Sequence, residues 1–276
     1  MEYDPIKRRL GNVFNRTPFL RKLFYSLLDL LLLRAWHVLK ELKSLKKKSF
    51  SGKIRILDAG SGFGQYSYRM SRIFSGSIIK GVDVKQEQID DCNRFFTSIG
   101  LNERVFFEYA DLTKFTEPYS YDLILSVDVM EHIEEDELVF NNFYKSLRNN
   151  GVLLISTPSD QGGSDTDEHE HDQNTVHGFI EEHVRDGYGI ADITQKLNLA
   201  GFSDIEVHYT YGTAGSLSWK FSMKYPILML GKSKAFFILL PFYYLITFPF
   251  CAILNYFDVN FRHKKGTGLL VKAYKK

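Results

Sequence analysis

The stretch ILDAGSGFG, residues 56–64, decides the fold class. A short apolar run is followed at once by three glycines at alternate positions, Gly60, Gly62 and Gly64. Glycines between a strand and a helix let the backbone approach a ligand closely, because no Cβ stands in the way. A dinucleotide-binding fingerprint would place its third glycine at Gln65, so the spacing disfavours a nicotinamide oxidoreductase.

Outward from this loop, short apolar runs alternate with helical patterns. Helical patterns cover residues 85–99 and 134–148. The runs that have the length and composition of strands are 53–59, 77–83, 104–110, 121–127 and 151–157. This alternation predicts an α/β fold with a parallel sheet covered on both faces, whose ligands bind at the carboxyl ends of the strands.

Three acidic residues stand at those expected strand ends. Asp58 precedes the glycine turn, where it can orient the loop or meet an ammonium group. Asp83 ends the second strand, where a carboxylate can accept two hydrogen bonds from a ribose diol. Asp111 follows the third strand and could accept a hydrogen bond from the adenine amine. Strand ends often carry Asp as a cap, so the joint placement beside the loop is the informative observation.

Residues 53–157 resemble the class I S-adenosylmethionine (SAM) dependent methyltransferases. The family's D-x-G-x-G-x-G loop falls on residues 58–64, its ribose acid on Asp83 and its adenine acid on Asp111. The resemblance implies a Rossmann-like seven-stranded sheet whose last strand is antiparallel. Its late strands would be 203–211 and the chain end, 264–276. The residues it implies for SAM binding are Asp58, Gly60, Ser61, Gly62, Gly64, Asp83, Val84, Asp111, Leu112 and Ser126.

The end of the fourth strand, within YDLILSVDVMEHIE (121–134), carries the candidates for catalysis. It resembles the quinone-pathway O-methyltransferases, in which a carboxylate, a Glu and a His bind Mg²⁺ beside the acceptor hydroxyl. Asp128, Glu131 and His132 occupy these positions, although Asp128 is one methylene shorter than the Glu of that subfamily. Two alternatives stay open: a Mg²⁺ site, or a metal-free cleft in which Asp128 and His132 orient the acceptor or remove its proton.

A long polar segment follows the fifth strand, between residues 158 and 189. It exceeds an ordinary connection, so it is expected to be a lid, a binding loop or a disordered segment. Its four histidines could reach the cleft, and a zinc site there is disfavoured because no cysteine accompanies them. They are His169, His171, His177 and His183.

The charges divide the chain into an acidic middle and two basic ends. Residues 1–56 carry 14 Lys and Arg against 4 Asp and Glu, residues 57–212 carry 11 against 28, and residues 213–276 carry 10 against 1. The basic ends are also strongly apolar, which favours an anionic membrane surface over nucleic acid as a partner. The alternative is that the ends fold against the acidic middle.

This pattern predicts four parts of the chain. Residues 1–50 form a basic amphipathic helical extension, in which Thr17 and Pro18 start one long helix that runs to about Lys48. Residues 51–212 form the SAM-binding core, 213–263 an apolar helical insert, and 264–276 the final strand.

The insert contains 235–257, a stretch of 23 residues without a charge, which is long enough to span a bilayer. A single crossing would separate the two late strands that must pair, and Pro241 and Pro249 should break or kink a straight helix. An interfacial or re-entrant helical hairpin is therefore expected. The alternative is a helical pair buried under the main domain.

The sequence thus predicts a cytoplasmic, peripheral membrane enzyme. Two cysteines, Cys92 and Cys251, exclude a disulfide framework. No apolar run follows the first basic residues, so a cleaved secretory signal is not expected. We expect a SAM-dependent methyltransferase acting on an oxygen of a lipophilic small-molecule or lipid-linked acceptor. The alternatives are a soluble methyltransferase of a small aromatic or polyketide-like acceptor and a non-catalytic binding protein of the same fold.

Overall fold

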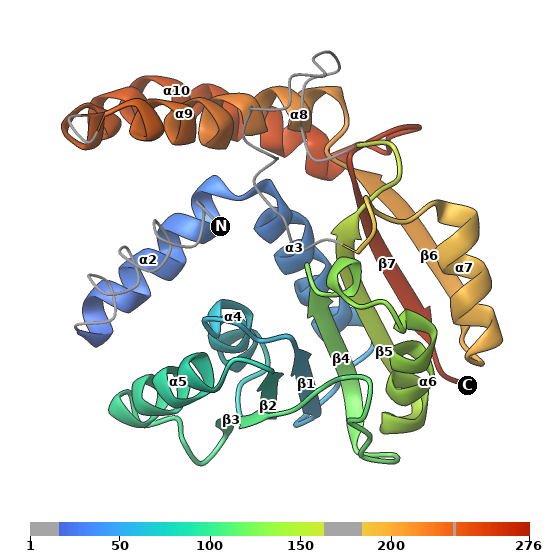
Figure 1. Ribbon diagram of the computed structural model, residues 1–276. Helices are drawn as coiled ribbons and strands as arrows, with labels where there is room; N and C mark the ends of the chain where they lie inside the picture. The colour runs from blue at the N-terminus through green and yellow to red at the C-terminus, as the bar shows by residue number, and fades with distance from the viewer. Residues whose placement is uncertain (1–16, 163–183, 234–235) are drawn as a thin grey trace.

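The computed structural model describes residues 17–162, 184–233 and 236–276 (Figure 1). Within them, seven strands form one sheet in the order β3-β2-β1-β4-β5-β7-β6. Strands β1 to β5 are parallel, whereas β7 is antiparallel to both of its neighbours. The expected sheet is confirmed. Its strands are β1 (Arg55–Ala59), β2 (Ile78–Asp83), β3 (Val105–Tyr109), β4 (Tyr121–Val127), β5 (Leu147–Pro158), β6 (Ser203–Thr210) and β7 (Gly268–Tyr274).

Helices cover both faces of the sheet. Neighbouring strand residues point to opposite sides, so apolar residues in succession make both faces hydrophobic. Ile56 and Leu57 are both fully buried, and they belong to two different hydrophobic clusters. The Ile56 face is covered by α3 (Leu33–Lys48), α4 (Gln65–Ile73) and α5 (Gln86–Ser98), and the Leu57 face by α6 (Asp136–Ser146) and α7 (Ile190–Leu199). A ligand therefore has to approach at the carboxyl ends of the strands.

The N-terminal segment forms two helices, so the expectation of one long helix is wrong. Thr17 caps α2 (Pro18–Leu31) as expected, through its side chain and the N–H of Leu20. Leu32 then adopts an extended backbone, with φ −89° and ψ 108°. The break lets α3 lie on the sheet while α2 turns away from it, above α4 and α5 in Figure 1, and Arg21 of α2 bonds to the loop after β1. Neither Gly nor Pro marks this position in the sequence.

An apolar helical hairpin connects β6 to β7. The chain leaves β6 through α8 (Thr213–Trp219), a π-helical turn (Lys220–Lys224) and α9 (Tyr225–Lys232), and it returns through α10 (Phe236–Asn260). Figure 1 shows α9 and α10 side by side, projecting from the body of the molecule. β6 and β7 pair with each other, with Thr210 opposite Gly268. The expectation that the two late strands pair, on which the prediction of a hairpin was based, is therefore confirmed.

Helix α10 continues through both of its prolines, so the expected break at Pro241 and Pro249 is wrong. The hydroxyls of Tyr243 and Tyr244 donate to backbone carbonyls of the π-helical turn at 2.7 and 2.8 Å. These bonds and the packing against α8 fix α10 against the segment that precedes it. By length and composition alone, α10 could cross a bilayer, with a mean hydropathy of 2.1 over its most apolar 18 residues.

The polar segment after β5 is only partly described. β5 itself is longer than expected and starts at Leu147. The four histidines of the segment, His169, His171, His177 and His183, lie outside the described residues.

Candidate functional site

The glycine loop after β1 adopts a conformation that depends on its glycines. Gly60, Gly62 and Gly64 have φ values of 78°, 49° and 74°, in the left-handed region. A Cβ on Gly60 would stand 2.2 Å from a methyl carbon of Val129, and a Cβ on Gly64 would stand 3.1 Å from Sγ of Cys92. The packing therefore leaves no space for a side chain at Gly60 and little at Gly64, whereas Gly62 is required by its backbone conformation alone.

Asp58, near the end of β1, precedes the glycine loop and is bonded to the helix that follows the loop. Its side chain is buried, and Oδ2 accepts a hydrogen bond from the hydroxyl of Ser67 on α4 at 2.6 Å. Burial, with a smaller contribution from the charge of Asp83, raises the pKa of Asp58 to about 7. These contacts fix the end of β1 against α4, and both roles expected for Asp58, orienting the loop and meeting an ammonium group, stay predictions.

Asp83 lies directly against the loop. Its Oδ2 accepts from the N–H of Gly62 at 2.9 Å, and its Oδ1 accepts from the N–H of Lys85 at 3.0 Å. The backbone N–H groups of Gly60 and Ser61 donate to the carbonyl of the preceding residue of β2, Val82, both at 2.9 Å. These bonds bring the ends of β1 and β2 together as the sequence predicted. Val84, the next residue, is more than half exposed beside them.

Asp111 stands at the end of β3, the next strand along this edge. Its Oδ1 accepts from both the backbone N–H and the hydroxyl of Thr113, at 2.9 and 2.7 Å. These bonds lower the pKa of Asp111 and keep the carboxylate charged. Leu112 is buried, and its carbonyl accepts from the side-chain amide of Asn142 at 3.0 Å.

Two buried hydroxyls at this edge lack a partner among the described residues. They belong to Ser61 in the loop and Ser126 near the end of β4. Ser126 pairs in the sheet with Ala59, the residue just before the loop. Buried hydroxyls are normally hydrogen-bonded, so these two are candidates for bonds to a polar ligand. Together with the Asp83 carboxylate and the glycine backbone, this donor and acceptor set fits the predicted SAM.

The loop is also held from outside by α2, as the alternative in which the basic ends fold against the acidic middle allows, although the contacting residues were not predicted. Nη2 of Arg21 donates to the carbonyl of Phe63 at 2.9 Å, and the hydroxyl of Tyr25 donates to the same oxygen. Farther along α2, Asp29 accepts from the side-chain amide of Gln65 at 2.7 Å and pairs with Arg69. Helix α2 therefore forms one wall of the candidate site.

The end of β4 carries a strained acidic residue. Asp128 has a φ of 51°, which is uncommon for a residue other than glycine, and its N–H donates to the carbonyl of Ser156 at 2.9 Å. Its carboxylate forms an ion pair with Arg34, the second residue of α3. Strained backbone of this kind is typical of functional sites. The N-terminal segment thus contacts the end of β4, where the catalytic candidates were predicted, as well as the loop.

The comparisons with known proteins now decide the family. A family model described as a methyltransferase domain matches residues 50–201, more than half of the chain. The chain belongs to this methyltransferase family. A phosphoethanolamine N-methyltransferase 1 of Zea mays is 30% identical over 152 residues, which are 55% of this chain and 28% of that protein. The chain therefore spans less than a third of the length of that relative.

Two further similarities fit this family. A ubiquinone biosynthesis O-methyltransferase of Pelagibacter ubique is 23% identical over 121 residues, covering 44% of this chain and 49% of that protein. A solved structure of Haemonchus contortus phosphoethanolamine N-methyltransferase 2 in complex with SAM has a TM-score of 0.60 at 18% identity, covering 87% of this chain and 52% of that chain. The methyltransferase thus has the fold of SAM-dependent methyltransferases.

The Mg²⁺ site, one of the two alternatives for the end of β4, does not form among the described residues. No group of three or more His, Cys, Asp or Glu side chains there could hold a metal ion. Asp128 is paired with Arg34, and Glu131 is buried, with its Oε2 accepting from the hydroxyl of Thr157 at 3.1 Å. Burial raises the pKa of Glu131. His132 is exposed at the end of the 3₁₀ turn Met130–His132. The three side chains therefore do not fit the metal.

Sequence reasoning missed two tyrosines near Arg34, Tyr211 and Tyr66. The hydroxyl of Tyr211, just after β6, accepts from the N–H of Arg34 at 3.0 Å. Burial raises the pKa values of Tyr211 and Tyr66, and the charge of Arg34 acts against that rise in both. The positive φ of Tyr211, 55°, could not be seen in the sequence, and no local pattern pairs it with Arg34.

Proposed function

We propose that the chain transfers a methyl group from SAM to a lipophilic or lipid-linked acceptor at a membrane surface, with oxygen as the methylated atom. The sulfonium of SAM is already activated, so the protein has to align the acceptor in line with the methyl group and exclude water. In this proposal the glycine loop, Asp83, Asp111 and Ser126 hold the donor. Asp128 and His132, at the end of β4, orient the acceptor and receive its proton.

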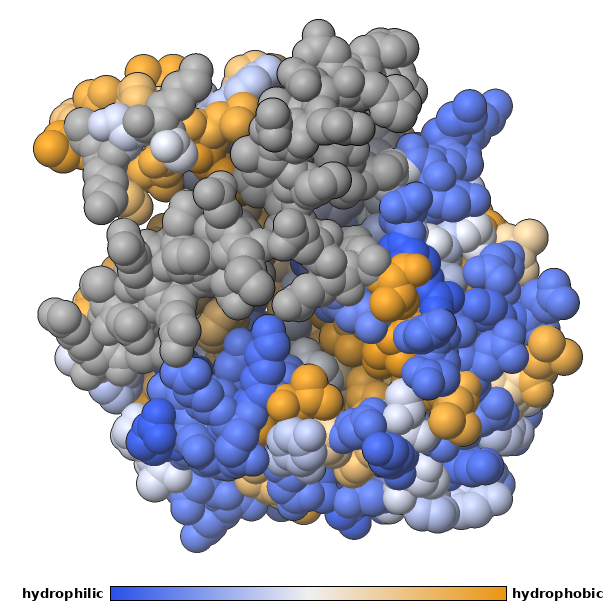
Figure 2. Space-filling view, viewed as in Figure 1, coloured by the Kyte–Doolittle hydropathy of each residue, from blue (hydrophilic) through white to orange (hydrophobic). Residues whose placement is uncertain are grey.

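The observation that carries the membrane part is the exposed apolar surface of the hairpin. Ile238, Leu245 and Ile246 of α10 are 74, 75 and 78% exposed. Figure 2 shows hydrophobic side chains gathered over the projecting helices, at the upper left, whereas in the lower half of this face hydrophobic patches are scattered among hydrophilic residues. Only 6% of the most apolar part of α10 is buried. A helix this apolar and this exposed needs a non-aqueous partner.

The charges around the hairpin complement an anionic lipid surface. Residues 213–276 carry 10 Lys and Arg against a single acid, Asp258, which is buried. Several of these basic residues flank the apolar part, among them Lys220 and Lys224 before it and Arg262, Lys264 and Lys265 after it. Each basic residue near an anionic bilayer contributes about 1 kcal/mol of attraction.

Helix α2 connects this surface with the donor site. Its inner side holds the glycine loop through Arg21 and Tyr25. Its outer side is an exposed apolar stripe of Phe19, Leu23, Leu27 and Leu30, spaced at helical intervals. In Figure 1, α2 and the α9–α10 hairpin extend toward the same side of the molecule. An acceptor held in a membrane on that side would lie next to the donor.

A second candidate follows from one relative. The maize protein is named a phosphoethanolamine N-methyltransferase, so a nitrogen of an amine-bearing head group is the alternative methylated atom. The membrane surface and the donor site serve either acceptor. The methylated product distinguishes them, because an O-methyl ether and an N-methylamine separate by mass spectrometric fragmentation.

The experiment supplies the full-length chain with SAM labelled in its methyl group and a total membrane lipid extract. We expect label in the organic phase, bound to a lipophilic product. Asp83→Asn should lose this transfer. Asp122→Asn should keep it, because Asp122 lies near the amino end of β4, away from the strand ends that form the site. Label confined to water-soluble products would contradict the lipophilic acceptor.

A further inference from the structure

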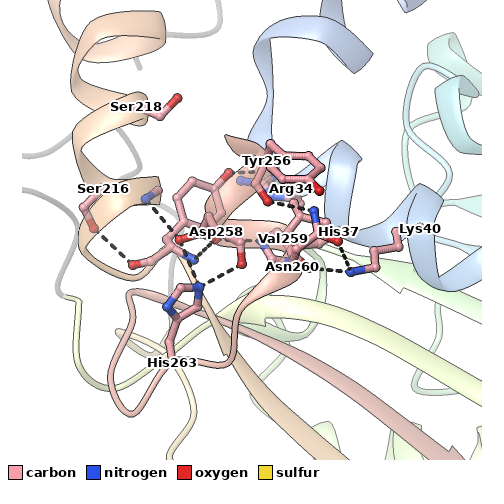
Figure 3. Close-up of polar contacts among 12 residues, drawn as sticks. Arg34, His37, Lys40, Ser216, Ser218, Tyr256, Asp258, Val259, Asn260 and His263 are labelled. Carbon is pink, nitrogen blue, oxygen red and sulfur yellow. Dashed lines mark hydrogen bonds and ion pairs between the residues drawn. The ribbon is translucent and has the colours of Figure 1, made fainter. Parts of the chain in front are cut away.

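Asp258 is a buried acid in an otherwise apolar helix. It lies near the end of α10, is fully buried, and is the single acid of residues 213–276. Figure 3 shows His37 and His263 directed at its carboxylate. Nε2 of His37 lies 2.8 Å from Oδ1, and Nε2 of His263 lies 3.2 Å from Oδ2. The carboxylate therefore joins α3, α10 and the segment before β7.

Two backbone N–H groups complete the set around Asp258. The N–H of Tyr211 donates to Oδ1 at 3.1 Å, and the N–H of Gly215 donates to Oδ2 at 3.0 Å. Burial by itself would raise the pKa of Asp258, but the hydrogen bond and charge of His37, with His263 and the amide of Tyr211, lower it overall. The charged form is thus the form that these contacts stabilise.

Two of these partners, His37 and Tyr211, help to fix the start of α3, where Arg34 lies. His37 follows Arg34 by one helical turn on α3, so its bond to Asp258 fixes the first turns of that helix. Tyr211 is fixed at its backbone by Asp258, and its hydroxyl accepts from the N–H of Arg34. Helix α3 has no cap from the side chain of Leu32, so Tyr211 supplies the acceptor that a helix start requires.

Arg34 is a cation that interacts with several side chains around the proposed acceptor site. Its guanidinium pairs with Asp128, and its charge acts on the pKa values of Glu131, Tyr66 and Tyr211. The side chains of Arg34 and Asp128 are 34 and 26% exposed, so the pair stands at the surface of the site, where an acceptor would meet it. A small movement at the start of α3 would displace the guanidinium from the carboxylate.

We infer that Asp258 is a positioning residue that holds Arg34 against Asp128, at the place where the acceptor enters the site. Through this contact the apolar hairpin is joined to the acceptor site. That an acceptor enters beside this ion pair rests on the proposed function, whereas the role of Asp258 in placing Arg34 does not. Buried polar networks of this kind select one arrangement of the elements they join. Apolar packing between α8 and α10 would hold the hairpin without an acid, so the network has a purpose beyond anchoring it.

The test measures how fast phenylglyoxal modifies Arg34, located by mass spectrometry of peptides. Asp258→Asn and Tyr211→Phe should each raise the rate at Arg34 by roughly fivefold. Tyr211→Phe removes the acceptor of the backbone N–H of Arg34, and Asp258→Asn weakens the bonds that hold Tyr211 and His37 in place. Lys40→Met is the matched control, since it removes another polar contact between α3 and α10, to the carbonyl of Val259 at 2.7 Å. It should leave the rate at Arg34 unchanged.

Arg148, which pairs with Asp122 far from the hairpin, is the internal reference. Faster modification of Arg34 with a constant rate at Arg148 would support the inference. If Asp258→Asn unfolds, Arg148 will react faster as well, and Tyr211→Phe, which removes only a hydroxyl, then decides. Unchanged reactivity of Arg34 in a folded Tyr211→Phe chain, or an equal rise with Lys40→Met, would overturn it.

The same variants are then assayed for transfer of labelled methyl groups to the lipid extract. We expect the half-saturating amount of extract to rise and that of SAM to stay constant, a separation that a general loss of stability would not produce. A rise for SAM alone would overturn the inference. Absence of transfer by the unaltered chain would contradict the proposed function and leave the measured position of Arg34 standing.

Discussion

Nη2 of Arg21 lies 2.9 Å from the carbonyl oxygen of Phe63, the residue between the last two glycines of the loop. Tyr25 donates to the same oxygen and also accepts from Nε of Arg21 at 2.8 Å. A loop with three glycines has little stiffness of its own. Helix α2 therefore supplies rigidity that the loop lacks, and it is part of the candidate donor site.

Replacing Tyr25 by Phe tests this contact. Tyr25→Phe removes one donor to Phe63 and should lower the free energy of unfolding by about 1 kcal/mol and the affinity for SAM by about fivefold. Urea denaturation and titration calorimetry measure the two effects. Tyr256→Phe, an exposed position on α10, is the control and should change neither. An unchanged affinity in Tyr25→Phe would remove α2 from the donor site.

Gly60 and Gly100 form a matched pair for testing the glycine loop. Both have positive φ, 78° and 69°, so alanine strains the backbone at either site. A Cβ on Gly60 would meet Val129, whereas a Cβ on Gly100 would meet nothing within 4 Å. Gly60→Ala should therefore abolish SAM binding and lower the melting temperature more than Gly100→Ala, which should still bind. Equal effects in calorimetry and thermal denaturation would show that the close packing does not matter.

Asp58 predicts a specific dependence of stability on pH. Its pKa rises from 3.8 to about 7 on burial, so between these values the folded chain keeps a proton that the unfolded chain has lost. This contribution to stability is complete below pH 3.8, falls as the pH rises toward 7 and then levels off, a change of up to about 4 kcal/mol.

Asp58→Asn cannot ionise and should lack this contribution. Urea denaturation from pH 4 to 8 gives the free energy of unfolding of both chains. The value for the unaltered chain minus that for Asp58→Asn should fall across this range and become flat above about pH 7. A constant difference would mean that Asp58 is ionised throughout.

Two exposed apolar residues test the membrane surface. Ile246 of α10 and Leu199 of α7 are 78 and 72% exposed, so glutamate at either position should be tolerated by the fold. Ile246→Glu should strongly reduce co-sedimentation with anionic vesicles, because a charge at an inserted surface is costly. Leu199→Glu should leave it unchanged. Equal co-sedimentation of the two variants would contradict membrane contact through the hairpin.

The core of the fold could be predicted because its signals are local. The runs that became β1 to β4 are short and apolar, and Gly60 to Gly64 follow the first of them directly. Asp83 and Asp111 could be placed for the same reason, since the carboxyl ends of parallel strands share one edge. Their roles toward SAM stay predictions.

The contacts that complete the site could not be predicted, because they join residues far apart in the chain. Arg21 reaches Phe63 across 42 residues, and Arg34 reaches Tyr211 across 177. The break at Leu32 has no sequence signal either, since it follows from where α2 and α3 pack. The expected Mg²⁺ site had the right residue types, but Arg34 pairs with one of its ligands.

Titration calorimetry with SAM tests the central claim most directly, on the full-length chain and on Asp83→Asn and Asp122→Asn. Asp83 accepts from the loop, whereas Asp122 pairs with Arg148 at the opposite edge of the sheet. We predict that the unaltered chain binds one SAM, that Asp83→Asn binds it at least about tenfold more weakly, and that Asp122→Asn binds it normally. No binding by the folded, unaltered chain would contradict the account.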